Sequence, residues 1–302
     1  MSAIVLSLTK PAISLSRFML ERVRNYWMLI KDLQTGLLLF TALAGYISGC
    51  CINLGAPSLG ALVGSLFLTI SGSTILNMVY DCDIDALMHR TIHRPLPSGK
   101  VSKGEAFVLG VSLSSLGIGW GFQMNINYGA VLLVGLVFNV LVYTVWLKRR
   151  TPYAIIWGGL AGGMPALAGR TLAMGYLDTI GLLMAAGVLL WIPTHIMTYN
   201  IKHASDYQKA AIPTFPSVYG EKVTRLVIAG SSLASVSILL ITGNLIGLSL
   251  SHLRGLALLG LLFLFLVIAG IIRPGKTLNF TLYKGASIYM LVSMLLIIYG
   301  GL

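Results

Sequence analysis

The sequence has very few charged residues. Of its 302 residues, 10% are Asp, Glu, Lys or Arg, whereas 56% are hydrophobic. So little charge cannot cover the surface of an ordinary water-soluble domain, and this excludes that class. The composition indicates instead a polytopic membrane protein built from α-helices, because a helix satisfies its own backbone hydrogen bonds inside a bilayer.

Cysteine is also scarce, and one common phosphate-binding motif is missing. The three cysteines are Cys50, Cys51 and Cys82, an odd number with two of them adjacent, so structural disulfides are not expected. No glycine-rich run ends in the Lys-Ser/Thr of a P-loop. The 34 glycines therefore predict closely packed membrane helices rather than a phosphate cradle.

Long apolar runs are abundant. Nine stretches have the roughly 20 residues needed to cross a bilayer. They are residues 33–52, 57–79, 105–123, 128–147, 153–172, 177–199, 224–247, 255–273 and 281–302. If these spans alternate in direction, nineteen of the 21 Lys and Arg residues lie on one side, and only Arg170 and Arg254 lie on the other.

This charge asymmetry predicts the topology. The side rich in Lys and Arg is the cytoplasmic side, and it includes the N-terminus. The net charge of +12 then reflects membrane orientation, and no nucleic-acid partner is expected. We predict an all-α bundle in which residues 1–32 form a cytoplasmic or interfacial segment and residues 33–302 form a nine-span domain. The basic, Ser-containing residues 1–27 also have the composition of a mitochondrial transit peptide.

Acidic residues gather where Lys and Arg do. Two of the predicted cytoplasmic loops, residues 80–104 and 200–223, each contain carboxylate, His and Lys or Arg side chains. Each of these loops follows a span, and three further spans separate them. This spacing is typical of a duplicated half in which each half supplies one wall of a shared site. We therefore expect a polar working surface at the cytoplasmic end.

Asn77, Asp81 and Asp85 stand at four-residue steps. On an α-helix such residues share one face, whereas Asp83 points away from it. Amide and carboxylate oxygens suit Mg²⁺ that also carries substrate phosphates. The alternative is a set of solvated acidic groups at a helix end, but negative charge at a helix C-terminus opposes the helix dipole. The pattern thus predicts a Mg²⁺–phosphate site at the membrane surface.

Several cations follow these acidic residues or match them in other loops. Arg90 and Arg94 lie just beyond the stripe that Asn77, Asp81 and Asp85 form on the helix. Lys148 and Arg149 follow another span. The planar fork of arginine binds two phosphate oxygens, which favours a diphosphate contact. Each of these residues also fits the alternative of a topology anchor.

These residues carry a resemblance to a known family. Asn77-x-x-x-Asp81-x-x-x-Asp85 resembles the signature of the intramembrane UbiA-type prenyltransferases. Further blocks resemble their haem branch, the protohaem IX farnesyltransferases or haem O synthases. These blocks are Met88-x-Arg90-Thr91-x-x-Arg94-Pro95-Leu96-Pro97-Ser98-Gly99, Tyr143-Thr144-x-x-Leu147-Lys148-Arg149-Arg150-Thr151-Pro152, Trp191-x-Pro193-x-His195, and Asp206-Tyr207-x-Lys209-Ala210-x-Ile212-Pro213.

The resemblance implies a Mg²⁺-dependent prenyltransferase. Farnesyl diphosphate and protohaem IX (haem B) would yield haem O and diphosphate, with water completing the hydroxyethyl group. The implied catalytic and metal-binding residues are Asn77, Asp81, Asp85 and Asp206; the implied substrate-binding residues are Arg90, Arg94, Lys148, Arg149, His195, Tyr207, Lys209 and Lys31. Imidazole is a common ligand of haem iron, so His195 is expected either to contact the porphyrin or to pack between helices.

The resemblance also implies a setting. The protein is expected in membrane lipid as a multi-pass protein, in a prokaryotic plasma membrane or, in a eukaryote, the mitochondrial inner membrane. Contact with haem-handling or terminal-oxidase assembly proteins is a further implication.

The sequence departs from the family pattern at three places. Asp206 is the one carboxylate where many relatives have a second Asp-x-x-x-Asp pair, Lys31-Asp32 replaces a usual Lys-Pro, and Arg170 replaces a common Trp.

Alternatives stay open at this stage. A related enzyme could prenylate a quinone-ring precursor or a glycerol-phosphate lipid. A secondary transporter would place ionisable residues at mid-span, whereas these carboxylates lie at span ends. A non-catalytic haem-handling protein would leave the Asn-Asp-Asp stripe without a purpose.

Overall fold

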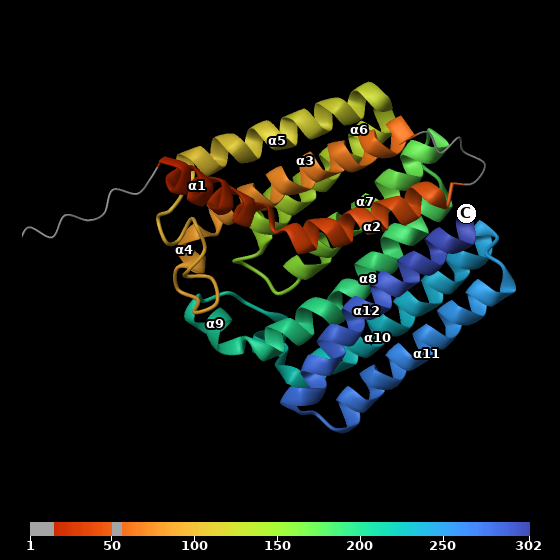
Figure 1. Cartoon of the computed structure of the whole chain (residues 1–302). Helices are drawn as coiled ribbons and strands as arrows, with labels where there is room; N and C mark the ends of the chain where they lie inside the picture. Colours follow the sequence, from red (N-terminus) through yellow and green to blue (C-terminus); the bar gives the residue numbers. More distant parts are fainter. Residues whose placement is uncertain (1–14, 50–55) are drawn as a thin grey trace, which may run out of the picture.

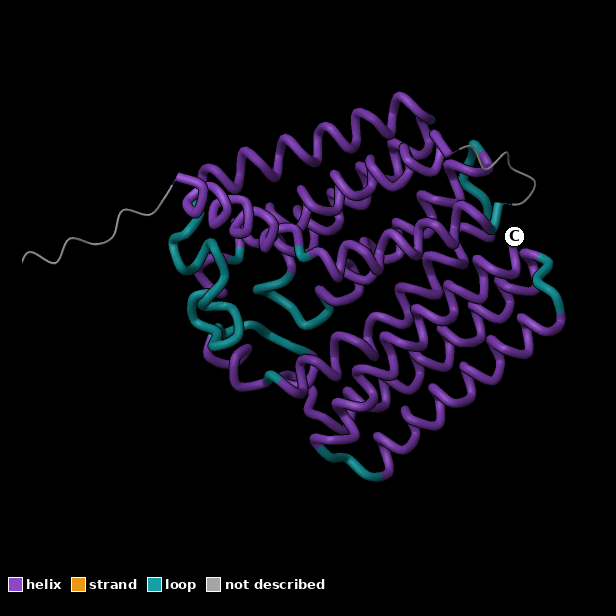
Figure 2. Tube along the Cα trace, viewed as in Figure 1, coloured by secondary structure: helices purple, strands orange, loops and turns teal. Residues whose placement is uncertain are grey.

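The structure is a computed structural model that describes residues 15–49 and 56–302. Within these ranges the chain forms helices joined by turns and loops, with no strand (Figures 1 and 2). The elements are α1 (Leu15–Ile30), α2 (Asp32–Ile47), α3 (Ala56–Tyr80), α4 (Cys82–Asp85), α5 (Lys103–Met124), α6 (Ile126–Leu136), the π-helix η1 (Val137–Leu147), α7 (Ala154–Met174), α8 (Thr179–Lys202), α9 (Ala204–Lys209), α10 (Phe215–Ile246), α11 (Leu250–Ile272) and α12 (Lys276–Gly301). The prediction of an all-α bundle is confirmed.

The predicted apolar stretches coincide with helices wherever the structure describes them. Among the described residues, seven helices are long and apolar enough to cross a membrane, and an eighth is added if α1 and α2, which are bent by 50° at their junction, form one span. α7 is not among them, because its glycines and Arg170 lower its mean hydropathy. The protein is thus a multi-span membrane protein, but the count of nine spans is not confirmed. Residues 50–52 of the first stretch lie outside the described ranges.

Glycine permits the closest helix contacts. α2 packs on α7 and α3 on α5. A Cβ atom at Gly45 would lie 2.0 Å from the Ala166 carbonyl oxygen, and one at Gly169 would lie 1.9 Å from the Ala42 carbonyl oxygen. No larger residue fits such backbone-to-backbone contact between α2 and α7. The glycines act here as the sequence predicts, by packing helices.

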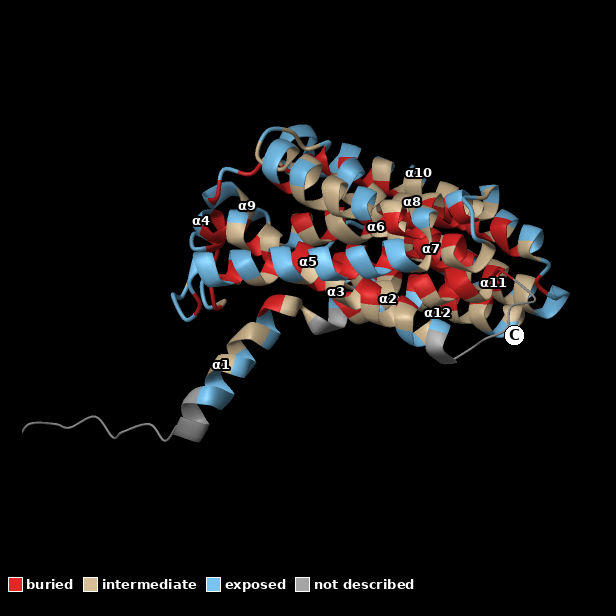
Figure 3. Cartoon of the chain, turned by 90° about the horizontal axis from the view of Figure 1, so that it is seen from above, coloured by how far each residue is buried: buried red, intermediate tan, exposed pale blue. Residues whose placement is uncertain are grey.

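The first described helix differs from the rest. α1 extends away from the bundle (Figure 3) and exposes large apolar side chains at Met19, Leu20, Val23 and Trp27. A helix with one apolar and one charged face is typical of the membrane interface. This geometry is compatible with the predicted interfacial segment, although residues 1–14 lie outside the described ranges.

The polar loops gather at one end of the bundle. α4 follows α3, α9 follows α8, and both lie at the end that α1 also occupies (Figure 1). The C-terminus lies at the opposite end. The two loops that the sequence predicts to share a surface, residues 80–104 and 200–223, are therefore neighbours at the same end of the bundle.

Candidate active site

A cavity of about 550 Å³ runs into the bundle from this polar end. Its walls come from α2, α3, α6, η1, α7, α8 and α12, together with the polar segments that follow α3, η1 and α8. The charged residues that line it are Lys31, Asp85, Arg90, Arg94 and Lys148. Most of the other lining residues are apolar or aromatic, so one end of an apolar chamber carries the charge.

The four-residue spacing of Asn77, Asp81 and Asp85 is kept across a break in the helix. α3 ends at Tyr80, and Asp81 has φ −83° and ψ 1° before the short α4 begins. The backbone N–H of Asp81 still donates to the Asn77 carbonyl at 2.9 Å, and that of Asp85 donates to the Asp81 carbonyl at 2.8 Å. Asp81 and Asp85 are buried, whereas the side chain of Asp83 is 57% exposed. The predicted division of the three aspartates between two faces is confirmed.

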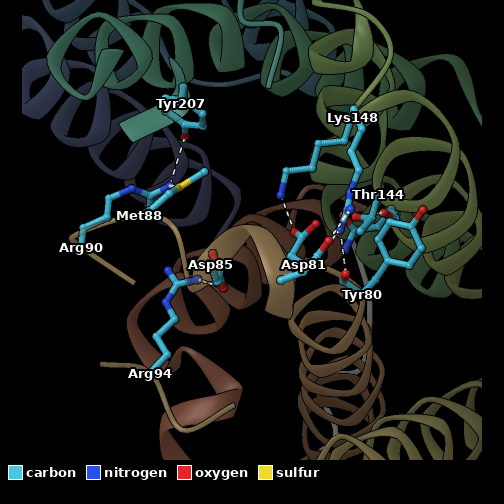
Figure 4. Close-up of polar contacts among 12 residues, drawn as sticks. Tyr80, Asp81, Asp85, Met88, Arg90, Arg94, Thr144, Lys148 and Tyr207 are labelled. Carbon is cyan, nitrogen blue, oxygen red and sulfur yellow. Dashed lines mark hydrogen bonds and ion pairs between the residues drawn. The ribbon is translucent and has the colours of Figure 1, made fainter. Parts of the chain in front are cut away.

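Each buried carboxylate meets a cation from a distant segment or a loop (Figure 4). Lys148 Nζ donates to Asp81 Oδ2, and Arg94 donates to Asp85 Oδ2 at 2.8 Å. Arg90 lies 3.9 Å from an Asp206 oxygen. Since these cations also line the cavity or lie at its mouth, they can exchange a carboxylate oxygen for a phosphate oxygen of a ligand.

Arg90 sits among aromatic rings on the α8–α9 side. Its guanidinium donates to the Tyr207 hydroxyl at 3.4 Å and lies 5.3 Å from the Tyr199 ring centroid and 5.5 Å from that of Tyr207. Rings on two sides restrict the orientation of the guanidinium. Arg90 and Tyr207, both predicted from the sequence, therefore lie together in the cavity wall.

Two predicted substrate contacts lie elsewhere. Arg149 makes two 2.7 Å hydrogen bonds to Asp83, stacks over Tyr80 and does not line the cavity. Arg149 follows Lys148 directly in the sequence, but its side chain points away from the cavity, towards Asp83. Lys209 is exposed at the end of α9 and also does not line the cavity. The structure does not place either residue where it would touch a ligand in this chamber.

Lys31 lies in the junction between α1 and α2. Its φ of 52° is unusual for a residue with a side chain and is held by its surroundings. Burial and the positive charges of Arg94 and Lys148 lower the pKa of Lys31 to about 8. A nearby anion would stabilise the charged form of Lys31, and its role in substrate binding stays a prediction.

Two oxygens on the stripe have no hydrogen-bond partner within the described residues. They are Asn77 Oδ1 and Asp81 Oδ1, and both are buried. Buried oxygens of this kind normally have a partner, which a cation can supply. Burial also raises the pKa of Asp81, although Lys148 opposes this effect.

The described residues do not contain three His, Cys, Asp or Glu side chains close enough to hold a metal ion by themselves. Mg²⁺ uses one or two carboxylates and completes its shell with water and substrate phosphates. The donor set therefore fits Mg²⁺ bound together with a phosphate ligand.

The π-helix η1 brings three cavity residues onto one face. Asn139, Tyr143 and Lys148 all line the cavity. Asn139 and Lys148 are nine residues apart, about two and a half turns of an α-helix, which would place them on opposite sides. The wider turn, in which the Lys148 N–H donates to the Tyr143 carbonyl at 2.8 Å, returns them to the same side. No pattern in the sequence indicated this.

An aromatic stack forms the α8–α12 wall. The His195 ring lies 5.0 Å from Trp191 and 4.7 Å from Tyr283, stacked on both. Trp191 Nε1 donates to the Ala286 carbonyl at 2.8 Å, and His195 Nδ1 lies 3.2 Å from Ser287 Oγ. Both hydrogen bonds join α8 to α12. The sequence predicted His195 but not Tyr283 or Ser287, since α12 is distant in the chain and carries no recognisable motif.

The fold and site together define an intramembrane protein with a deep apolar chamber and a charged, phosphate-compatible mouth. The chain belongs to the UbiA prenyltransferase family, whose model matches residues 38–295. This membership agrees with the resemblance seen in the sequence motifs.

Relatives in this family cover most of the chain. The protoheme IX farnesyltransferase of Korarchaeum cryptofilum is 41% identical over 214 residues, covering 70% of this chain and 72% of that protein. The protein of the same name from Archaeoglobus fulgidus is 39% identical over 203 residues, with 67% and 70% covered. The one from Bartonella quintana is 39% identical over 209 residues, with 67% and 65% covered.

Solved structures share the fold at low sequence identity. A digeranylgeranylglyceryl phosphate synthase superposes with a TM-score of 0.78 at 20% identity, covering 93% of this chain and 99% of that one. A UbiA homologue from Archaeoglobus fulgidus bound to GPP and Mg²⁺ gives a TM-score of 0.68 at 15% identity, covering 91% and 99%. At these identities the likeness concerns the fold alone.

Proposed function

We propose that the protein transfers the farnesyl group of farnesyl diphosphate to a vinyl group of protohaem IX, giving haem O and diphosphate. The observation that carries this proposal is the cavity itself, an apolar and aromatic chamber whose mouth holds buried carboxylates and cations. The relatives named protoheme IX farnesyltransferase support the choice of donor and acceptor.

Mg²⁺ would be held by Asn77, Asp81 and Asp85, with Asp206 across the mouth. When bound, it supplies Lewis-acid stabilisation of the departing diphosphate. The unpartnered oxygens of Asn77 and Asp81 support this assignment, as does the solved homologue bound to GPP and Mg²⁺.

The chain's own cations bind the diphosphate. Lys148 and Arg94 exchange their partners Asp81 and Asp85 for phosphate oxygens, and Arg90 and Lys31 complete the positive end of the cavity. Charge-assisted hydrogen bonds to phosphate are among the strong ones, so this cluster fixes the donor with its prenyl chain pointing into the bundle. The apolar walls then keep bulk water away from the allylic cation.

The acceptor lies against the aromatic wall. Trp191 and Tyr283 stack against the His195 ring and fix its orientation in the cavity wall. His195 Nδ1 is engaged with Ser287, which leaves Nε2 for the haem iron. In this arrangement the aromatic wall binds protohaem while the polar mouth binds the diphosphate.

The setting follows from the same proposal. Residues 1–32 form an interfacial lead-in and residues 33–302 the catalytic domain, with the N-terminus and the polar mouth on the cytoplasmic side. The membrane is a prokaryotic plasma membrane, where haem-handling or terminal-oxidase assembly proteins deliver the acceptor or receive the product.

The test is a transfer assay with the purified protein in lipid vesicles. Mg²⁺ and farnesyl diphosphate are supplied with protohaem, an aromatic acid or a glycerol-phosphate lipid as acceptor, and products are identified by mass. We expect farnesylated haem that carries a hydroxyl group. Prenylation of one of the other acceptors with haem unchanged would replace this proposal with the corresponding alternative.

A further inference from the structure

One wall of the cavity is polar well inside the bundle. Ser73 and Thr74 on α3 and Asn139 on η1 line the chamber opposite the aromatic wall of α8 and α12. Polar side chains at membrane depth are costly and commonly mark functional sites. The diphosphate and porphyrin contacts described above do not use these three residues.

These side chains keep hydrogen-bonding capacity. Asn139 Nδ2 donates to Ser73 Oγ at 2.6 Å, but Asn139 Oδ1 and the Thr74 hydroxyl make no hydrogen bond within the described residues. Two other hydroxyls on the cavity wall differ, because Thr69 donates to the Ser65 carbonyl at 2.8 Å in its own helix. Thr41 is likewise bonded to its own helix. Ser73, Thr74 and Asn139 therefore keep donors and acceptors available to a ligand, whereas the hydroxyls of Thr69 and Thr41 do not.

These three residues lie inward of the diphosphate end of the cavity, on the side where the reacting carbons would lie. Ser73 precedes Asp81 by eight residues, which is about 12 Å along an α-helix. Asn139 is held level with it by the Ser73 hydrogen bond, on the same face of η1 as Lys148. A diphosphate at Asp81 and Lys148 places the first prenyl carbon a few ångströms inward, and the acceptor carbon must approach it to about 3 Å. The vinyl group then lies on the inward side of the diphosphate, between the level of Asp81 and that of Ser73 and Asn139.

We propose that Ser73, Thr74 and Asn139 hold the water molecule that completes the product, an inference that rests on the proposed farnesyl transfer to protohaem. The farnesyl carbon–oxygen bond breaks and its electron pair leaves with diphosphate. The terminal vinyl carbon forms the new carbon–carbon bond, which leaves a cation on the vinyl carbon next to the porphyrin. The held water adds its oxygen to that carbon, and its proton passes to the diphosphate.

This assignment reconciles two needs of the reaction. The allylic cation must be kept from water, yet the product requires one water molecule. A water fixed by two to four polar partners occupies one place only. Held inward of the diphosphate, such a water is placed to reach the cation that carbon–carbon bond formation leaves on the vinyl carbon.

The test is the ratio of two products. Without a held water, the same cation loses a proton and gives an alkene that is lighter than haem O by one water. We expect Thr74→Val and Asn139→Leu each to raise the alkene-to-alcohol ratio about tenfold, the effect of losing one hydrogen bond in the step that captures water. Thr69→Val is the matched control, since it removes a cavity hydroxyl that is bonded to its own helix. The wild-type alcohol should take up ¹⁸O from labelled water.

Thr74→Val removes no hydrogen bond within the described residues, so its product ratio is informative even if Asn139→Leu disturbs the contact between α3 and η1. An unchanged ratio in Thr74→Val, an equal rise in Thr69→Val, or an alcohol without label would overturn the inference while leaving farnesyl transfer intact. A wild-type protein that forms no farnesylated haem would overturn the proposed function and this inference with it.

Discussion

Lys148 Nζ and the Asp81 carboxylate form an ion pair that joins the end of η1 to the end of α3, across 67 residues of sequence. A second ion pair, between Arg149 and Asp83, joins the same two segments. The first pair faces the cavity and the second faces away from it. Two parallel ion pairs thus hold the same two segments together, and a ligand can reach only one of them.

The aspartates on the two faces should respond differently to substitution. Asp81→Asn and Asp85→Asn are expected to lower farnesyl transfer by about 10²-fold or more, because each removes a charge that holds the metal and diphosphate. Asp83→Asn should lower it less than about tenfold, since its partner Arg149 lies outside the cavity. Turnover is measured at saturating substrate, and a chelator should mimic the first two variants. Full wild-type turnover without any divalent ion would contradict the metal assignment.

The adjacent cations Lys148 and Arg149 offer a matched comparison. Lys148→Met should raise the KM for farnesyl diphosphate by about 10-fold to 100-fold, the effect of losing a charge-assisted hydrogen bond. Arg149→Met should leave that KM nearly unchanged and lower the free energy of unfolding by about 1 kcal/mol or less, since its bond to Asp83 is exposed. Steady-state kinetics and thermal melts distinguish the two effects. Equal increases in KM would mean that Arg149 also reaches the ligand.

Substrate binding should depend on pH through Lys31. With a pKa of about 8, this lysine passes from roughly nine-tenths charged at pH 7 to about one-tenth charged at pH 9. The charged form binds the diphosphate, so the KM for farnesyl diphosphate should rise over this interval. Lys31→Arg should reduce the rise because arginine stays protonated, whereas the exposed Lys209→Arg should not change it. An identical pH profile in the Lys31 variant would remove this residue from the binding site.

Haem binding should depend on His195 and not on the diphosphate end. His195→Ala is expected to weaken protohaem binding by at least about tenfold and to remove the absorption shift that accompanies an imidazole–iron bond. Binding of a prenyl diphosphate should be unaffected. His252 provides the control, since it is bonded to Ser249 at the far end of the bundle. If His195→Ala binds haem normally and keeps its activity, the residue packs α8 against α12 and does nothing more.

The membrane topology can be tested with tags. A tag at the N-terminus and one in the loop of residues 80–104 should be accessible from the same, cytoplasmic face, because α1 and α4 share one end of the bundle. A C-terminal tag should be accessible from the other face. This requires α2 and α7 to cross the membrane as well as the seven helices that meet the length and hydropathy criteria. Both termini on one face would mean an even number of spans.

Features with a local cause could be predicted from the sequence. The Asn77, Asp81 and Asp85 stripe depends only on the period of the helix, and it persists through the break at Asp81 because the backbone keeps its four-residue hydrogen bonds. The helical segments follow in the same way from runs of apolar residues, which must satisfy their own backbone in lipid.

The sequence alone therefore determined the all-helical membrane class, the polar end and the stripe of Asn77, Asp81 and Asp85. Only the tertiary structure decided which cation meets which carboxylate, that Lys148 faces the cavity while Arg149 and Lys209 do not, and that Tyr283 and Ser287 of α12 enclose His195 of α8. Such pairings depend on how helices distant in sequence rotate and pack against one another. The π-helical turn of η1 was also decided only by the tertiary structure. Its change of helical period moves Asn139 and Lys148 onto one wall, and no local signal in the sequence indicates it.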